Sequence, residues 1–202
     1  MPPNANRKQS RWTLADIGTK QPDAGAPWAV VTLGGVSLYG PDAPWLDAAI
    51  ERIRKAVEQA ARERLLLVRK QLEKVAKERI GEEVSERVLG AVIGRSLRLG
   101  ITIVVPCLTI NGRVLRMYSH KDNIVDIREK LALLDALLTE KTAMSVEAGQ
   151  SACFPGRGWE TKFLARQLLS HLAYKGRAVF IDDDLFASPI PSIKDALRNR
   201  CK

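Results

Sequence analysis

The amino-acid sequence predicts an α+β fold, in which a small antiparallel sheet packs with several helices. Two observations indicate strands: residues 28–40 form a β-rich run around a Gly-Gly pair, and residues 101–119 form a second run around an Asn-Gly pair. A third observation indicates helices, because apolar residues recur every three or four positions through residues 44–80 and again through 122–139.

The first 27 residues differ in composition from the rest of the chain. They contain four prolines among mostly polar residues, and such a segment cannot bury enough apolar surface to order itself. We therefore predict a disordered tail over residues 1–27, followed by a single α+β domain over 28–202. Trp12, Leu14 and Ile17 are spaced so that this part of the tail could become a short helix on a protein partner.

Residues 28–40 predict two short strands joined by a turn, and the longest helix follows them. After Pro44 the chain has neither Gly nor Pro before Gly81, and apolar residues are three or four apart throughout. The pattern predicts one long helix over about 44–80 that protrudes from the domain. A stripe of that length is typical of a coiled coil, so we expect a homodimer. Lys70 and Lys74 lie opposite the stripe and predict a basic ridge.

Three further helices are predicted after this segment. The first covers residues 82–99, and the second covers 122–139 behind an Asp122 cap. The third runs over 159–174 and ends before Gly176, after which a strand begins. A short terminal helix is expected at 192–200.

The strand pair at 101–119 is predicted as a hairpin with a two-residue turn. Asn111-Gly112 permits a type I′ turn, which would pair Ile110 with Arg113. One face of the hairpin would then carry Leu108, Ile110, Leu115 and Met117, and the other would carry Cys107, Thr109, Val114, Arg116 and Tyr118. We interpret the first face as core. The second either faces solvent or lies under a helix that supplies a carboxylate to Arg116.

The charge of the chain favours polyanionic partners. Lys and Arg number 32 against 23 Asp and Glu, which gives a formal charge of +9 and a pI near 9.7. Residues 101–121 contain three of these cations and no Asp or Glu. No run of eighteen apolar residues and no apolar leader is present, so we expect a cytoplasmic protein without a membrane span.

These observations predict a non-catalytic nucleic-acid-binding protein, of accessory or regulatory type, whose ligand is DNA or RNA. Phosphate contacts are expected from the hairpin, from the basic ridge and from the Gly-rich loop at 153–162, while aromatic rings stack on bases or sugars. The predicted binding residues are Lys70, Lys74, Arg113, Arg116, Tyr118, Lys121, Arg157 and Trp159.

The few cysteines and histidines predict no metal site and no cofactor. Cys107, Cys153 and Cys201 are an odd set without Cys-x-x-Cys spacing, and the only histidines are His120 and His171. Neither histidine lies beside a nucleophile signature, so no catalytic triad can be assembled from the sequence.

Two other functions stay open. Asp182, Asp183 and Asp184 follow a strand, and together with Glu160 and Lys162 they could hold Mg²⁺ in a nuclease or phosphoryl-transfer enzyme. Alternatively, the chain is a helical protein–protein adaptor whose charge keeps it soluble. Mg²⁺-dependent cleavage would indicate the enzyme, and indifference to nucleic acid would indicate the adaptor.

Overall fold

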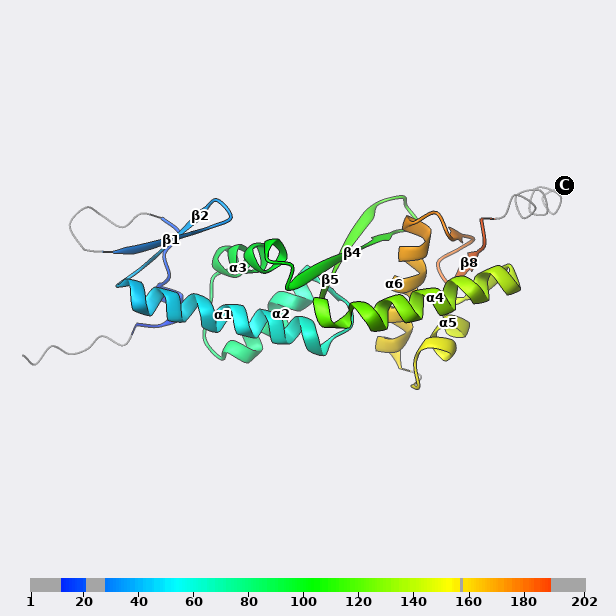
Figure 1. Ribbon diagram of the computed structural model, residues 1–202, viewed down its shortest axis with the longest axis horizontal. Coiled ribbons are helices and arrows are strands. Elements are labelled where there is room, and N and C mark those ends of the chain that lie inside the picture. Colours follow the sequence, from blue (N-terminus) through cyan, green and yellow to red (C-terminus); the bar gives the residue numbers. More distant parts are fainter. Residues whose placement is uncertain (1–11, 21–27, 157, 190–202) are drawn as a thin grey trace, which may run out of the picture. The chain divides into compact units, whose positions relative to one another are not determined.

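The computed structural model describes residues 12–20, 28–156 and 158–189, and it confirms the α+β class (Figure 1). The helices are η1 (Leu14–Asp16), α1 (Ala43–Glu63), α2 (Arg69–Ile80), α3 (Glu86–Arg98), η2 (Lys121–Asn123), α4 (Ile124–Lys141), α5 (Val146–Cys153) and α6 (Trp159–Tyr174). The strands are β1 (Ala29–Leu33), β2 (Val36–Gly40), β3 (Leu67–Val68), β4 (Thr102–Leu108), β5 (Val114–His120), β6 (Ala143–Ser145), β7 (Val179–Phe180) and β8 (Leu185–Ala187). The predicted terminal helix at 192–200 lies outside the described residues.

The chain divides into two compact units. Unit 1 comprises residues 1–59 and 73–99, and unit 2 comprises residues 60–72 and 100–202. The described strands form three small antiparallel sheets, ordered β1-β2 in unit 1, and β3-β5-β4 and β6-β8-β7 in unit 2. None of the described helices is long and apolar enough to cross a membrane.

Unit 1 contains the predicted pair of short strands. Gly34 and Gly35 both have positive φ, at 59° and 80°, as a two-residue type I′ turn requires. The turn pairs Leu33 with Val36, and α3 packs against β1. Ser85 begins α3 by accepting a hydrogen bond from the Val88 N–H at 3.3 Å.

Residues 12–20 belong to the predicted disordered tail, but the structure gives them a fixed place in unit 1. Leu14 and Ile17 are each only 4% exposed, and Gly18 exchanges two backbone hydrogen bonds with Tyr39 of β2. The remaining residues of the predicted tail lie outside the described residues.

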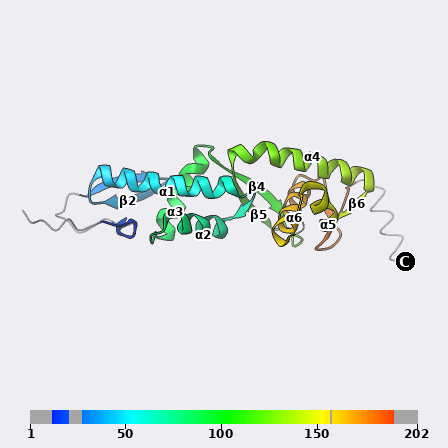
Figure 2. The same cartoon turned by 90° about the horizontal axis from the view of Figure 1, so that it is seen from below.

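The prediction of one continuous helix over 44–80 is wrong. Helix α1 ends at Glu63, β3 follows, and α2 begins at Arg69 (Figures 1 and 2). The side chain of Asn123 reaches the end of α1, where its amide donates to the carbonyls of Ala61 and Arg62 at 3.2 Å and of Arg64 at 3.4 Å. These are carbonyls that a continuing helix would use, so a distant residue replaces the local stop signal.

Much of the apolar stripe that suggested a dimer is buried within a single chain. Its residues from Leu46 to Ile80 include Ile53, Val57 and Leu72, each 0% exposed. The homodimer prediction assumed that this apolar stripe is exposed in a single chain. Because much of it is buried, the stripe gives no support for a dimer, and dimerisation stays a prediction.

The 101–119 hairpin is present, but its register differs from the prediction by one residue. Thr109 pairs with Arg113 through backbone and side-chain bonds, and the Gly112 N–H donates to the Thr109 carbonyl at 2.9 Å. Only Gly112 of the turn has positive φ, so the loop has three residues rather than two. Val105 therefore pairs with Met117, and Cys107 with Leu115.

The core of unit 2 lies between this hairpin and α6. Met117, Leu168 and Phe186 are fully buried there, and the Cys107 thiol donates to the Gln167 carbonyl of α6 at 3.2 Å. The register shift thus moves Cys107 from the predicted outer face into the core. Burial raises the pKa of its thiol to about 12.

Candidate nucleic-acid interface

The face of the hairpin opposite the Cys107 face exposes a cation between apolar residues. Cross-strand partners point to the same side of a sheet, so Arg116 shares this face with Pro106, and Val114 shares it with Leu108. Arg116 is exposed, and Val114 is 53% exposed. The alternative of a helical carboxylate above Arg116 is not found among the described residues. This face can contact a ligand.

A second cation lies at the tip of the hairpin. The Thr109 N–H donates to the Arg113 carbonyl at 2.8 Å, and the Thr109 hydroxyl also bonds both backbone groups of Arg113 at 3.0 Å. These bonds fix the backbone of Arg113 while its side chain stays exposed. Ile110 beside it is 46% exposed. The tip therefore presents one cation and one apolar side chain from an ordered loop.

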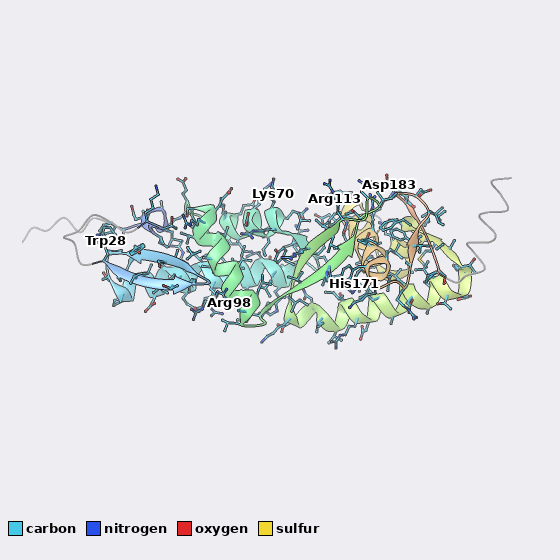
Figure 3. The ribbon with its side chains drawn as sticks, turned by 90° about the horizontal axis from the view of Figure 1, so that it is seen from above. Trp28, Lys70, Arg98, Arg113, His171 and Asp183 are labelled. Carbon is cyan, nitrogen blue, oxygen red and sulfur yellow. The ribbon has the colours of Figure 1, made fainter. Side chains whose placement is uncertain are left out.

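Strand β3 brings a third cation to the same sheet. It pairs with β5 so that Leu67 lies opposite Tyr118 and Val68 opposite Met117. One further step of that register would bring Arg69, the first residue of α2, to Arg116, and exposed Lys70 is the next residue along the chain. Figure 3 shows Lys70 and Arg113 on the same side of the ribbon. We call these three exposed residues the hairpin cations: Lys70, Arg113 and Arg116.

The hairpin cations lack carboxylate partners, as do Lys121, Arg128, Lys141 and Lys175 within the described part of unit 2. Within the described residues, none of the three forms an ion pair. Many cations elsewhere in unit 2 are neutralised, in the pairs Arg62–Asp122 at 3.1 Å, Arg64–Glu160 at 2.9 Å, Arg166–Asp183 at 2.7 Å and Arg177–Asp135 at 2.7 Å. Unpaired neighbouring cations repel one another, and a polyanion relieves that repulsion.

The other predicted binding residues lie elsewhere on these elements or outside the described residues. Lys121 lies at the opposite end of β5 from Arg113, about 25 Å away at the rise of a strand. Lys74 is exposed on α2 and lies 3.9 Å from Glu78. Trp159 is 72% exposed at the start of α6. Arg157 lies outside the described residues.

Tyr118, a predicted stacking residue, is buried. It is only 7% exposed and lies opposite Leu67 of β3, a strand that the sequence analysis placed inside a helix. Its ring is therefore not available for stacking on a base. The signal that would have indicated β3 is the run from Leu65 to Val68, which is apolar at every position and so does not follow an amphipathic helix pattern.

Most acidic residues of the alternative enzyme site are paired with cations, whereas Asp182 accepts from the backbone N–H of Asp184 at 2.8 Å. Asp183 bonds Arg166 at 2.7 Å, and Lys162 lies between Glu147 and Asp184. Across the described residues, no group of three or more His, Cys, Asp or Glu side chains is arranged to hold a metal ion. Glu160 bonds Arg64 instead of approaching the aspartates. The geometry of the described residues thus gives no support to a Mg²⁺-dependent nuclease or phosphoryl-transfer site.

The two histidines have structural contacts. His120 is 1% exposed, and its Nδ1 accepts from the Asp122 N–H at 3.2 Å. His171 donates from Nδ1 to the Pro106 carbonyl at 2.6 Å, and burial lowers its pKa. The second bond ties α6 to the edge strand β4.

Comparison of the chain with family models, with curated proteins and with solved structures finds no match. The function is therefore argued from the geometry and charge of the chain itself.

Proposed function

We propose that this protein binds the phosphate backbone of DNA or RNA through the hairpin cations, and that it does so without catalysing a reaction. The observation that carries the proposal is that Lys70, Arg113 and Arg116 are exposed on or beside the hairpin and form no ion pair with a described residue, whereas many other cations of unit 2 have carboxylate partners. Phosphate is the ligand that several such cations bind most strongly.

The shape of the surface also supports a nucleic-acid ligand. The face of the hairpin around Arg116 is exposed, and apolar side chains on that face can contact sugars and bases. Val104 and Val114 supply that apolar surface, at 38% and 53% exposure. A backbone contact of this type carries no sequence information, so we propose an accessory or regulatory role in the cytoplasm rather than a sequence-specific one.

Binding of labelled duplex and single-stranded oligonucleotides tests the proposal. The Arg113→Ala/Arg116→Ala double variant should bind about tenfold more weakly than the wild type at low salt, because two phosphate contacts of roughly 0.7 kcal/mol each are lost. Arg128→Ala is a matched control, since Arg128 is an exposed cation on α4 that forms no ion pair with a described residue. Equal affinity of the double variant and the control would refute the proposed surface.

A further inference from the structure

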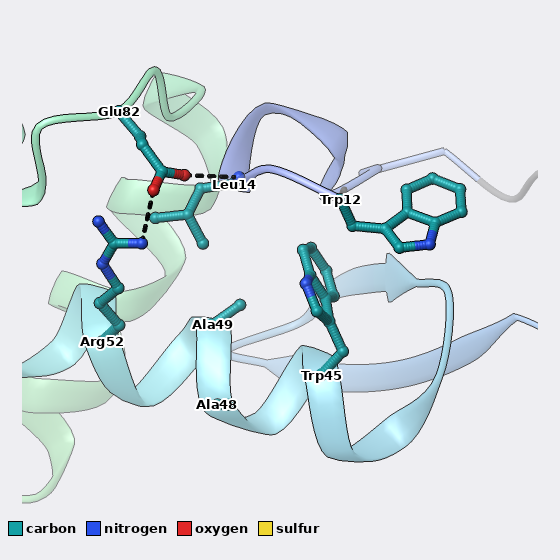
Figure 4. A pocket seen from close by; sticks show the side chains of 7 residues that line it. All are labelled: Trp12, Leu14, Trp45, Ala48, Ala49, Arg52 and Glu82. Atoms are coloured by element: carbon teal, nitrogen blue, oxygen red, sulfur yellow. Dashed lines mark hydrogen bonds and ion pairs between the residues drawn. The ribbon is translucent and has the colours of Figure 1, made fainter. Parts of the chain in front are cut away.

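Unit 1 contains a pocket whose lining residues come from three separate segments of the sequence. It has a volume of about 260 Å³ and is lined by Trp12, Leu14, Trp45, Ala48, Ala49, Arg52 and Glu82. Figure 4 shows two indole rings at one end, the Arg52 and Glu82 side chains at the other, and small apolar side chains between them. The pocket is therefore aromatic at one end and charged at the other.

The aromatic end is held in place by several contacts. Trp28 packs edge-on against Trp12, with ring centroids 5.9 Å apart and an interplanar angle of 74°. The backbone N–H of Trp45 donates to Asp42 Oδ1 at 2.8 Å, which fixes the backbone in the first turn of α1, and the Trp45 ring packs against Gly40. Both rings therefore have a supported position, although Trp12 is 41% exposed. A supported, exposed ring loses little conformational entropy when a ligand stacks on it.

Glu82 connects the segment around Trp12 to the rest of unit 1. One carboxylate oxygen accepts from the Leu14 N–H at 3.3 Å and the other accepts from Arg52 at 2.7 Å. Arg52 also donates to the Ile80 carbonyl at 2.7 Å, which leaves other N–H groups of its guanidinium unused by described residues. The charge of Glu82 is balanced by Arg52, so the pocket does not repel an anion.

The size and lining of the pocket decide which chemical class fits. A volume of about 260 Å³ is below the usual range of about 300–1,000 Å³ for drug-sized ligands, but it admits one planar ring system. Two indole rings favour a flat aromatic group, and the remaining N–H groups of Arg52 can donate hydrogen bonds to an attached phosphate. A nucleotide has both parts, and bases can enter such a pocket only from an unstacked, single-stranded segment.

We infer that this pocket binds an unstacked base of single-stranded nucleic acid, with the base against Trp12 and Trp45 and its phosphate near Arg52. The inference rests on the proposed function, because it names a base-binding site in addition to the phosphate-binding hairpin. Stacking on an aromatic side chain tolerates every base, so the pocket adds a preference for single strands without adding sequence specificity.

Fluorescence anisotropy with a labelled oligothymidylate, and with a duplex of the same length, tests this pocket. Trp12→Ala should weaken single-strand binding about tenfold or more and change duplex binding less than about twofold, while Trp12→Phe should retain most of the affinity. Tyr174→Ala is the matched control, since Tyr174 is 43% exposed on α6 and lies in unit 2. Thymidine monophosphate is added as a competitor.

The outcomes separate the pocket from the hairpin. If Trp12→Ala and the Tyr174→Ala control bind single strands with equal affinity while the Arg113→Ala/Arg116→Ala variant loses binding, the base-binding pocket is refuted and the proposed function stands. If Trp12→Ala loses single-strand binding while the hairpin variant keeps its affinity, the pocket stands and the proposed hairpin surface is refuted. Displacement by thymidine monophosphate at the concentration of the strand would assign the pocket to a free nucleotide and overturn the single-strand inference. Absence of any binding by the wild type would refute both.

Discussion

Replacement of Asn123 by alanine tests how the first long helix is terminated. The Asn123 amide donates to the carbonyls of Ala61, Arg62 and Arg64 at 3.2–3.4 Å and lies 3.3 Å from the Ser119 hydroxyl. An amide nitrogen carries two protons, so it makes at most two strong bonds at a time. Alanine removes both donors from the end of α1.

The expected loss of stability follows from these contacts. Two net hydrogen bonds at about 1 kcal/mol each give an upper value near 2 kcal/mol. Two of the carbonyl contacts are exposed and can bind water instead, so we expect about 1–2 kcal/mol. For a chain of this length, that corresponds to a decrease in Tm of about 2–8 °C. Asn123→Asp should cost more, because it places a carboxylate against three carbonyls.

Urea unfolding followed by circular dichroism measures this difference. Asn111→Ala is the matched control, since Asn111 is exposed at the hairpin tip and bonds no described residue through its side chain. We expect the control to lie within about 0.5 kcal/mol of the wild type. Equal midpoints for Asn123→Ala and Asn111→Ala would show that the amide does not terminate α1.

Four further predictions follow from the geometry. Iodoacetamide should label Cys107 at least tenfold more slowly in the folded protein than in urea at pH 8, because burial raises the pKa of its thiol to about 12. Peptide mass spectrometry measures the labelling rates, and equal rates would contradict this prediction. Burial lowers the pKa of His171, although its bond to the Pro106 carbonyl opposes this. The unfolded chain therefore binds the proton more readily than the folded protein. The free energy of unfolding should decrease as the pH falls below about 6.5, the ordinary pKa of a histidine. His171→Gln should lose less stability between pH 7.5 and 5 than the wild type, and an identical loss would argue against this. Asp183→Asn frees Arg166 and should leave nucleic-acid affinity unchanged or slightly higher, whereas loss of a Mg²⁺-dependent cleavage would favour the enzyme. Light scattering at increasing concentration tests the predicted homodimer, which a constant monomer mass would contradict.

The parts of the fold that the sequence predicted correctly depend on local signals. The Gly34-Gly35 turn, the presence of the 101–119 hairpin and the helices near 122–139 and 159–174 all follow from turn residues or from short-range apolar spacing. Such signals act between residues a few positions apart, so they can be read without knowledge of tertiary contacts.

The break in the predicted helix at 44–80 depends on a residue some 60 positions away. No Gly or Pro marks the end of α1, and the residues from Leu65 to Val68 are compatible with a helix. Pairing of Leu67 with Tyr118 and the bonds from Asn123 select a strand instead. Tertiary context therefore overrides a helical pattern that is correct on both sides of the break.

The hairpin register was wrong because one side chain favours a different turn. Asn111-Gly112 is compatible with a two-residue loop, but the Thr109 hydroxyl bonds both backbone groups of Arg113 and stabilises the three-residue loop. Arg116 lies on the exposed face of the hairpin, and its part in binding a ligand stays a prediction. The pairing of the hairpin with β3, and hence the burial of Tyr118, was not visible in the sequence.

The salt dependence of binding tests the central claim most directly. Affinity for a duplex should fall linearly on a plot of log K against log salt, and each removed phosphate contact should reduce the slope by about 0.9, or by about 0.7 on a single strand. Arg113→Ala and Arg116→Ala should each show this reduction on unrelated sequences, whereas Arg128→Ala should keep the slope of the wild type. Parallel slopes for all four proteins, or no binding at low salt, would contradict the account of the hairpin as a phosphate-binding surface.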